Sequence, residues 1–512
     1  MKKLFGRVLI VVPAIALQAA WFYFFLVNIN GVMDEHIVNA IHLIFTVLAV
    51  MFVTNLIAKR DESSYRLLWV LVITALPIFG ALLYLMLGHK STGKKLKRRL
   101  ERSRKQLVTP DADTSKDLIS EIKQSDLRIG QSLEHLCASA QFPVCRNDTS
   151  KYYPLGEDAF PDMCADLKKA KHFIFVEYFI IQSGKFWDTL TDIMAERAAE
   201  GVDVRVMYDD LGSISTYSVK DIAGLKKKGI KCIPFNPFFL ISSQLNNRDH
   251  RKIMVIDGEV AYSGGINLAD EYINEIERFG HWKDIAFRVT GTAVDSYTFM
   301  FAEFWNAFSI DKIPADLLEK NRPVHTPPEK ENGYIIPYYD SPMREEHTSN
   351  ELFTDMLSAA TDHIWFYTPY LLLGDALFDA FIRAARRGVD VRIMTPAIPD
   401  KKIVHRLTRS YYEDLLKAGV KVYEYTPGFV HAKAFIADDK VGSIGTVNLD
   451  YRSLFLHFEC NAVFFKADIL NELKKDFIAT QAKCKEWKLE DIKKGFLHKF
   501  VDNLLRVIAP LL

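Results

Sequence analysis

The residues with the clearest chemical pattern form a duplicated motif, H-x-K-x4-D. Its two copies comprise His250, Lys252, Asp257 and His431, Lys433, Asp438. The second copy follows the first by 181 residues at all three positions, and Asn448 follows Asn267 at the same distance. One short motif can arise by chance, but two copies in register with flanking residues predict two homologous halves.

Each copy presents its histidine and its lysine to the same side of the chain. Residues two positions apart on a strand point to one face, so His250 and Lys252 share a face, as do His431 and Lys433. A lone histidine on a strand is usually a core residue, whereas a pseudo-twofold arrangement brings two such faces together. The aspartate lies seven residues after the histidine, with opposite parity or past a turn. It completes the candidate catalytic motif, and we expect it to act as a structural partner.

Two histidines, two lysines and two asparagines suit phosphoryl transfer better than metal chemistry. One histidine can attack phosphorus while the other protonates the departing alkoxide. Lys252, Lys433, Asn267 and Asn448 can hold the charge that develops on the phosphate oxygens. These residues form no metal-ligand set, and the six cysteines show no metal-binding spacing. The sequence therefore predicts a site that uses no metal and no cofactor.

Two acidic residues are candidates for orienting the histidines. A nucleophilic histidine must be neutral and in the correct tautomer, which usually requires a carboxylate on its other nitrogen. The candidates are Asp284 in the segment HWKD and Glu459 in the segment HFEC. They are 175 residues apart, so they align at the repeat only if six extra residues intervene. An orienting role and a simple salt bridge explain these acids equally well.

Matching patterns of strand, helix and strand precede both motifs. Residues 172–181 (HFIFVEYFII) resemble residues 363–372 (HIWFYTPYLL), and both are rich in β-branched and aromatic side chains. Amphipathic helical patterns follow at residues 186–199 and 376–387, and then the segments GVDVRVM and GVDVRIM. This order predicts βαβ units with parallel strands, and thus an α/β protein built from two pseudo-twofold-related halves.

With these motifs the chain resembles the phospholipase D superfamily, whose signature is a pair of HKD motifs, and within it the bacterial cardiolipin synthases. GGINLADEY at residues 264–272, HWKD at 281–284 and IGTVNLDYRS at 444–453 carry the closer resemblance, which extends from about residue 65 to the C-terminus. It implies that a phosphatidyl group passes from one phosphatidylglycerol to another, giving cardiolipin and glycerol. It also implies a phosphohistidine on His250, with His431 as general acid and later as general base.

The N-terminal part is expected to lie in a membrane. Residues 8–28, 37–58 and 67–88 are free of charged side chains, and each stretch has about the 20 residues that a helix needs to cross a bilayer. Nine Lys and Arg residues between positions 90 and 105 are expected to lie against anionic headgroups, in preference to forming a solvated linker helix.

The distribution of basic residues predicts which side of the membrane the catalytic part faces. The positive-inside rule places the N-terminus and the second loop in the cytoplasm, so three full spans would place the catalytic part outside. The basic run after the third stretch favours the cytoplasmic face instead, and Pro77 and Gly80 allow that stretch to be a re-entrant hairpin. We therefore expect a multi-pass protein of the bacterial plasma membrane with its catalytic part at the cytoplasmic face.

These patterns divide the chain into four parts. Membrane segments are expected at 1–90, a basic helical linker at 91–130, the first phospholipase D-like half at 131–325 and the second at 326–512. The second half ends in an apolar helical stripe that includes Phe496, Phe500, Leu504 and Ile508. Packing of this helix on its own domain is favoured over a position in the membrane interface.

Composition and charge narrow the function. A formal net charge of +1 argues against a nuclease and against any nucleic-acid partner, since phosphate-backbone binding needs a clustered basic surface. A non-catalytic scaffold would be marked by loss of a motif histidine or lysine, and none is lost. The main alternatives to a cardiolipin synthase are a membrane phospholipase D that uses water and a transferase that uses another alcohol. The expected partners are phosphatidylglycerol and anionic membrane lipids. The sequence leaves open whether the protein forms a homo-oligomer.

Overall fold

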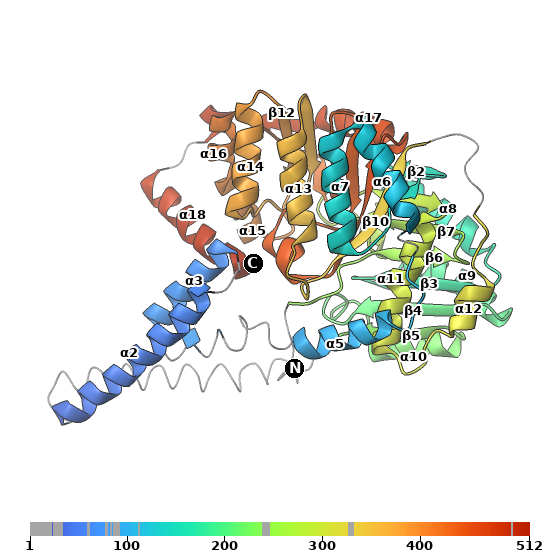
Figure 1. Ribbon diagram of the computed structural model, residues 1–512, viewed down its shortest axis with the longest axis horizontal. Helices are drawn as coiled ribbons and strands as arrows, with labels where there is room; N and C mark the ends of the chain where they lie inside the picture. The colour runs from blue at the N-terminus through green and yellow to red at the C-terminus, as the bar shows by residue number, and fades with distance from the viewer. Residues whose placement is uncertain are drawn as a thin grey trace.

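The two predicted halves form two α/β units that lie side by side, with a pair of helices protruding from one end (Figure 1). The computed structural model describes residues 23, 34–58, 62–76, 80–81, 84, 93–110, 113–237, 246–325, 332–492 and 495–511. Within these residues the predicted α/β class is confirmed.

The first half contains a seven-stranded sheet in the order β2-β9-β7-β6-β3-β4-β5. Three strands are parallel, namely β3 (Phe173–Tyr178), β4 (Asp203–Asp209) and β5 (Lys231–Phe235). The antiparallel strands are β2 (Ser150–Tyr153), β6 (Ile253–Ile256), β7 (Val260–Gly264) and β9 (Ala286–Thr290). The helices are α8 (Gly156–Leu167), α9 (Lys185–Ala199), α10 (Val219–Lys227), α11 (Ala293–Phe308) and α12 (Ala315–Lys320), with the 3-10 turn η3 (Asp270–Ile273).

The second half contains a nine-stranded sheet in the order β1-β10-β17-β16-β15-β11-β12-β13-β18. Its strands are β1 (Cys145–Arg146), β10 (Tyr334–Asp340), β11 (His363–Tyr367), β12 (Asp390–Pro396), β13 (Lys421–Tyr425), β15 (Ala434–Ala437), β16 (Val441–Gly445), β17 (Glu459–Phe465) and β18 (Cys484–Trp487). Strands β11, β12 and β13 are parallel. The strand–helix–strand units predicted before each motif are therefore confirmed as β3-α9-β4 and β11-α14-β12.

Helices cover the second sheet on the side that faces the viewer in Figure 1. They are α6 (Asp113–Ser125), α7 (Leu127–Ala140), α13 (Thr348–Ala359) and α14 (Asp375–Arg386). The remaining elements of this half are α15 (Lys402–Ser410), α16 (Tyr412–Ala418), α17 (Ile469–Gln481), α18 (Phe496–Ile508), the π-helical turn η4 (Arg452–Leu456) and the 3-10 turns η5 (Leu489–Asp491) and η6 (Ala509–Leu511). Because β1 pairs with β10, the segment between α7 and β1 joins the second half although it precedes the first in sequence.

Two short strands join the halves. β8 (His281–Lys283) of the first half pairs in parallel with β14 (Gly428–Val430) of the second. Aromatic side chains also join the halves, since Phe287 of β9 meets Phe464 of β17 at 5.6 Å between ring centroids. One apolar core therefore runs through both sheets and fixes their relative position.

The protruding helices are α2 (Glu35–Ala58) and α3 (Ser63–Ala75). The second predicted span coincides with α2, whereas the third is broken because α3 ends at Ala75. The first span lies outside the described residues. No helix in the described part of the chain combines the length and the apolar character needed to cross a bilayer, so the predicted spans are not confirmed.

Helix α18 contacts α3, whereas α5 packs on the first half. Helix α5 (Gly93–Arg104), which carries much of the basic run, packs on α11, and Ser103 donates a hydrogen bond to the Glu303 carbonyl (2.7 Å). Ion pairs Arg406–Asp502 (2.8 Å) and Arg506–Asp414 (3.0 Å) hold the polar side of α18 on α15 and α16. The apolar side of α18 stays exposed at Phe496, Leu497, Phe500 and Leu504.

Candidate active site

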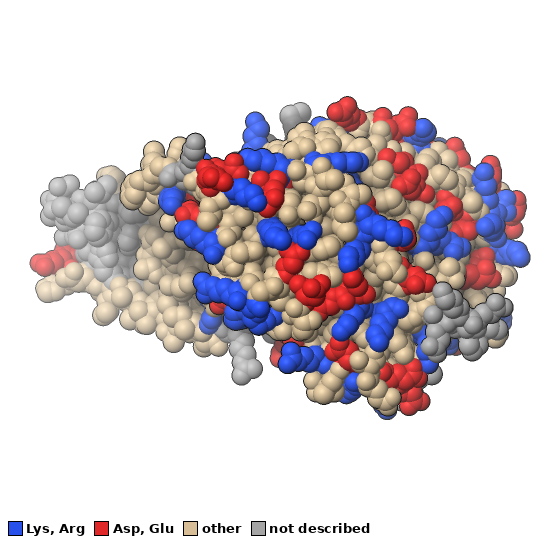
Figure 2. Space-filling model, turned by 90° about the horizontal axis from the view of Figure 1, so that it is seen from above, with Lys and Arg blue, Asp and Glu red and all other residues tan. Residues whose placement is uncertain are grey.

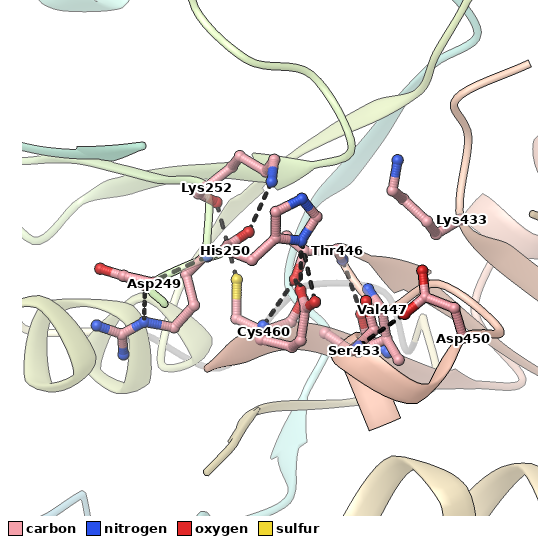
Figure 3. Close-up of polar contacts among 12 residues, drawn as sticks. Asp249, His250, Lys252, Lys433, Thr446, Val447, Asp450, Ser453 and Cys460 are labelled. Carbon is pink, nitrogen blue, oxygen red and sulfur yellow. Dashed lines mark hydrogen bonds and ion pairs between the residues drawn. The ribbon is translucent and has the colours of Figure 1, made fainter. Parts of the chain in front are cut away.

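The two motif histidines and lysines converge where the two halves meet. His250 and Lys252 lie just before β6, and His431 and Lys433 lie just before β15. All four side chains are buried. Figure 3 shows Lys433, from the second half, reaching toward the space beside the His250 ring, while Lys252 lies on the opposite side. Lys433 of the second motif therefore lies beside His250 of the first.

His250 is held by residues of the second half. Its backbone N–H donates to the Phe458 carbonyl (2.8 Å), and its Nδ1 donates to both oxygens of Glu459 (2.8 and 3.0 Å). Thr446 donates a further hydrogen bond to the same carboxylate (2.5 Å). The carboxylate that orients the first histidine thus comes from the start of β17, in the other half of the chain.

His431 is held in the same way by the first half. Its backbone N–H donates to the Lys283 carbonyl (2.7 Å), and its Nδ1 donates to Asp284 Oδ2 (2.6 Å). In both copies the residue before the histidine lies beside the residue before the acid, because Val430 pairs with Lys283 and Asp249 bridges Phe458. The two acids are therefore exchanged between the halves.

This exchange fixes the tautomer of both histidines. When Nδ1 donates to a carboxylate, Nε2 keeps its lone pair and can attack or accept a proton. Burial lowers the pKa of His250 well below its usual value, and Lys252 and Lys433 lower it further. Burial and Lys433 lower the pKa of His431 to about 4, while Asp284 opposes that shift. Both imidazoles are thus neutral near pH 7 before a substrate binds.

The two lysines lie beside the histidines and share their burial. Lys252 Nζ donates to the His250 carbonyl (2.6 Å), and Lys433 Nζ donates to the His431 carbonyl. Burial lowers the pKa of Lys252 to about 8 and that of Lys433 to about 7. An anionic phosphate between them would favour their charged forms, so the site suits a phosphodiester.

The two asparagines are not equivalent. Asn267 Oδ1 accepts the Ile180 N–H (3.1 Å), and its Nδ2 donates to the Tyr272 hydroxyl (2.7 Å). Asn448 is also buried, but its Oδ1 has no hydrogen-bond partner among the described residues. Asn267 therefore braces the β3 end of the site, and a role in holding phosphate charge remains a prediction for both.

The motif aspartates lie at the far ends of β6 and β15 and hold backbone. Asp257 accepts hydrogen bonds of 2.7–2.8 Å from three N–H groups at the start of β3, those of Lys171, His172 and Phe173. Asp438 does the same at the start of β11, with bonds of 2.8–2.9 Å from Thr361, Asp362 and His363. Their place in the candidate catalytic set is therefore corrected to a structural one, as their parity suggested.

Residues that the sequence did not single out surround each histidine. Buried ions lie behind His250, where Arg251 pairs with Glu177 and with Asp249 (3.1 Å). Aromatic rings surround His431, whose ring centroid lies 5.4 Å from Tyr272, 5.6 Å from Trp282 and 5.9 Å from Phe429. One sign of this difference was present in the sequence, because the middle residue of H-x-K is arginine in the first copy and alanine in the second.

No group of three or more His, Cys, Asp or Glu side chains in the described ranges is arranged to hold a metal ion. Charged side chains of both signs are scattered over the two halves on the face seen in Figure 2, with no continuous basic surface there. The two buried histidines, each with a carboxylate on Nδ1, can act as nucleophile and as proton carrier.

Comparisons with known proteins define the class and then the family. Residues 163–279 and 353–480 match the family described as "Cardiolipin synthase, PLD-like domain", and residues 44–89 match "Phospholipase_D-nuclease N-terminal". The chain aligns over 75% of its length with 99% of a phosphatidylserine synthase of Haemophilus influenzae, at a TM-score of 0.56 and 13% identity, which shows a shared fold. The class is thus a phospholipase D-like protein with two halves.

Two relatives illustrate the family. An uncharacterized protein of Streptococcus mutans is 42% identical over 90% of this chain and 99% of its own length. A cardiolipin synthase of Alkalihalophilus pseudofirmus is 31% identical over 94% of this chain and 96% of its own length. The chain belongs to the cardiolipin synthase family.

Proposed function

We propose that this enzyme is a phosphatidyltransferase that joins two phosphatidylglycerol molecules into cardiolipin and releases glycerol. The exchanged pairs His250–Glu459 and His431–Asp284, each next to a buried lysine, carry this proposal. They supply a nucleophile, a proton carrier and cationic ligands for one phosphodiester. Family membership supports the choice of lipid substrates, and the names of the synthase relatives support the product.

The first step forms a phosphohistidine. His250 Nε2 attacks the phosphorus of one phosphatidylglycerol, the bond from phosphorus to the glycerol oxygen breaks, and His431 gives its proton to that oxygen. Lys252 and Lys433 hold the charge on the non-bridging oxygens. His250 suits the nucleophile because burial and both lysines favour its neutral form, whereas Asp284 supports a protonated His431 once an anionic lipid is bound.

The second step transfers the phosphatidyl group to the second lipid. A headgroup hydroxyl of another phosphatidylglycerol attacks the phosphorus, its proton passes to His431 and the bond to His250 breaks. His431 is then protonated again for the next donor. Atoms and charge balance over the two steps without a metal or a nucleotide.

The test uses purified protein in liposomes that contain phosphatidylglycerol and no added metal. We expect cardiolipin and glycerol in equal amounts by lipid mass spectrometry and a glycerol assay. Phosphatidic acid as the sole product would identify a hydrolase that uses water. Formation of neither product would contradict phosphatidylglycerol as the donor.

The membrane attachment is part of this proposal. Helix α2 exposes apolar side chains along its length, among them Leu43, Val47 and Met51, and α18, which contacts α3, exposes Phe496 and Phe500. We place these surfaces in the bacterial plasma membrane, with the N-terminal segments crossing it more than once and the catalytic halves at its cytoplasmic face. Retention in the membrane pellet after alkaline washing, and labelling of a cysteine introduced at exposed Lys402 only from the cytoplasmic side, would support this arrangement.

A further inference from the structure

One buried acid of the site has no part in the mechanism above. Asp450 lies between β16 and η4, two residues after Asn448. At the offset of 181 residues its counterpart in the first half is Ala269. A carboxylate is therefore present on only one side of the pseudo-twofold arrangement, at a position where the other half has a methyl group.

Asp450 has no salt-bridge partner among the described residues. Its Oδ1 accepts the Ser453 N–H (2.8 Å), and it forms no ion pair within 4.0 Å in the described part of the chain. Burial raises the pKa of Asp450, while the Ser453 N–H, Lys401, Arg452 and the side chain of Asn448 oppose that shift. Figure 3 shows Asp450 beside Lys433, across the site from Lys252. The carboxylate thus lies within the cationic site and keeps the capacity to accept hydrogen bonds.

The neighbours of Asp450 connect it to the side of His431. The Tyr370 hydroxyl donates a hydrogen bond to Asp400 (2.5 Å), and burial, Asp400 and Asp450 raise the pKa of Tyr370 well above its usual value. The Tyr370 ring lies 6.4 Å from Phe429, and Phe429 stacks on His431 at 5.9 Å. Asp450 lies beside Lys433 (Figure 3), and the Nζ of that lysine donates to the carbonyl of His431, the histidine that handles the proton of the alcohol.

The chemistry of a carboxylate points to a hydroxyl ligand. An anionic carboxylate repels the phosphodiester, which the lysines already hold, but it accepts strong hydrogen bonds from hydroxyl groups. A glycerol headgroup has two free hydroxyls, so one can react at phosphorus while its neighbour is bound. Water has no second hydroxyl, so such a contact would discriminate between the two acceptors.

We infer that Asp450 forms a headgroup subsite that binds the non-reacting hydroxyl of a polyhydric alcohol while the adjacent hydroxyl faces His431. The subsite rests on the proposed function and deepens it. Because the leaving glycerol and the incoming alcohol both occupy the side opposite the attacking histidine, the subsite serves the departing headgroup first and the acceptor headgroup next. Asp450 is a binding residue that selects alcohol over water.

The experiment separates this role from a structural one. Phosphatidyl-p-nitrophenol is the donor, because its aryl leaving group has no hydroxyl for the subsite, and glycerol is added as the acceptor. Release of p-nitrophenolate reports attack by the histidine. The ratio of phosphatidylglycerol to phosphatidic acid reports the choice between glycerol and water.

We expect Asp450→Ala to release p-nitrophenolate within about threefold of the wild-type rate and to lower the product ratio about tenfold or more, as loss of a hydrogen bond to a charged group predicts. Asp450→Asn keeps an oxygen acceptor without the charge, so we expect a smaller decrease. Asp166→Asn is the matched control, because Asp166 is a buried acid that accepts from Tyr262 (2.7 Å) in the outer part of the first half. We expect that control to leave the ratio unchanged.

Two results would overturn the subsite. An unchanged product ratio in Asp450→Ala would show that Asp450 does not choose the acceptor. A parallel fall in p-nitrophenolate release in both Asp450 variants would show a structural role. A wild-type protein that forms only phosphatidic acid from phosphatidylglycerol liposomes would instead refute the proposed function, so the two failures are distinguishable.

Discussion

The surroundings of the two histidines differ although the motifs that carry them are copies. Behind His250, the guanidinium of Arg251 is fully buried, pairs with Glu177 and Asp249, and lies 3.4 Å from the centre of the Phe304 ring. Behind His431, the position of Arg251 is taken by Ala432, and the rings of Tyr272, Trp282 and Phe429 lie 5.4–5.9 Å from its imidazole, whereas His250 contacts the ring of Phe179 at 4.9 Å. The repeat thus preserves the reacting groups and changes what supports them.

A second buried ion pair strengthens the contrast. Arg248 contacts Asp209 through several hydrogen bonds of 2.8–3.0 Å, and Asp209 also accepts the Asp249 N–H (2.9 Å). Burial raises the pKa of Asp209 to about 6, while Arg248 opposes the shift. Directional ionic contacts therefore fix the strand segment before His250, whereas the imidazole of His431 packs among aromatic rings in addition to its hydrogen bond with Asp284. This difference fits a fixed nucleophile and a proton carrier that serves two successive alcohols.

The largest expected effect separates the two histidines by role. His250→Ala and His431→Ala should each lower cardiolipin formation about a thousandfold or more, because neither group can replace the other within a turnover. With phosphatidyl-p-nitrophenol, whose leaving group needs no proton, His431→Ala should still release about one equivalent of p-nitrophenolate per site. His250→Ala should release none. The amplitude of the p-nitrophenolate burst measures this release. The opposite pattern would reverse the assignment of nucleophile and proton carrier.

The exchanged carboxylates come next in size. Glu459→Gln and Asp284→Asn keep the shape of each side chain but remove the charge that fixes the histidine tautomer, so kcat should fall about a hundredfold or more. The effect of Glu459→Gln should persist with the aryl donor, since His250 is still the nucleophile. Asp284→Asn should regain most of its burst with that donor. Equal losses in both variants with both donors would argue that the two sides are not specialised.

The ionic support of His250 is tested through stability. Arg251→Met leaves Glu177 and Asp249 buried without their cation, which should lower the free energy of unfolding by about 3 kcal/mol or more. On the other side, Phe429→Leu changes only packing and should cost about 1 kcal/mol. Denaturant unfolding measures both. Similar values for the two variants would contradict the contrast between ions and rings.

The smallest effect is a pH dependence. Burial lowers the pKa of Lys433 to about 7 and that of Lys252 to about 8, so both lysines lose charge as the pH rises through that range in the free enzyme. The value of kcat/KM should therefore fall by about tenfold per pH unit between these two values and more steeply above the higher one. Lys433→Arg stays charged and should move the falling limb to higher pH. A limb that does not move would exclude Lys433 as its cause.

Local patterns in the sequence predicted much of the fold. Residues 172–181 and 363–372 predicted the strands that became β3 and β11, because a run of β-branched and aromatic side chains is typical of a buried strand. The third apolar stretch was less informative, since composition alone did not predict that α3 ends at Ala75. Apolar character indicates what avoids water but not where a helix ends.

The sequence by itself determined the repeat, the pairing of each histidine with its lysine on one face, and two acids able to orient a histidine. Only the tertiary structure decided which acid meets which histidine, because Glu459 lies 209 residues from His250 and Asp284 lies 147 residues from His431. Periodicity along one strand records the direction of side chains within that strand. The exchange between halves depends instead on how two sheets pack over a shared core, and no local pattern encodes that distance.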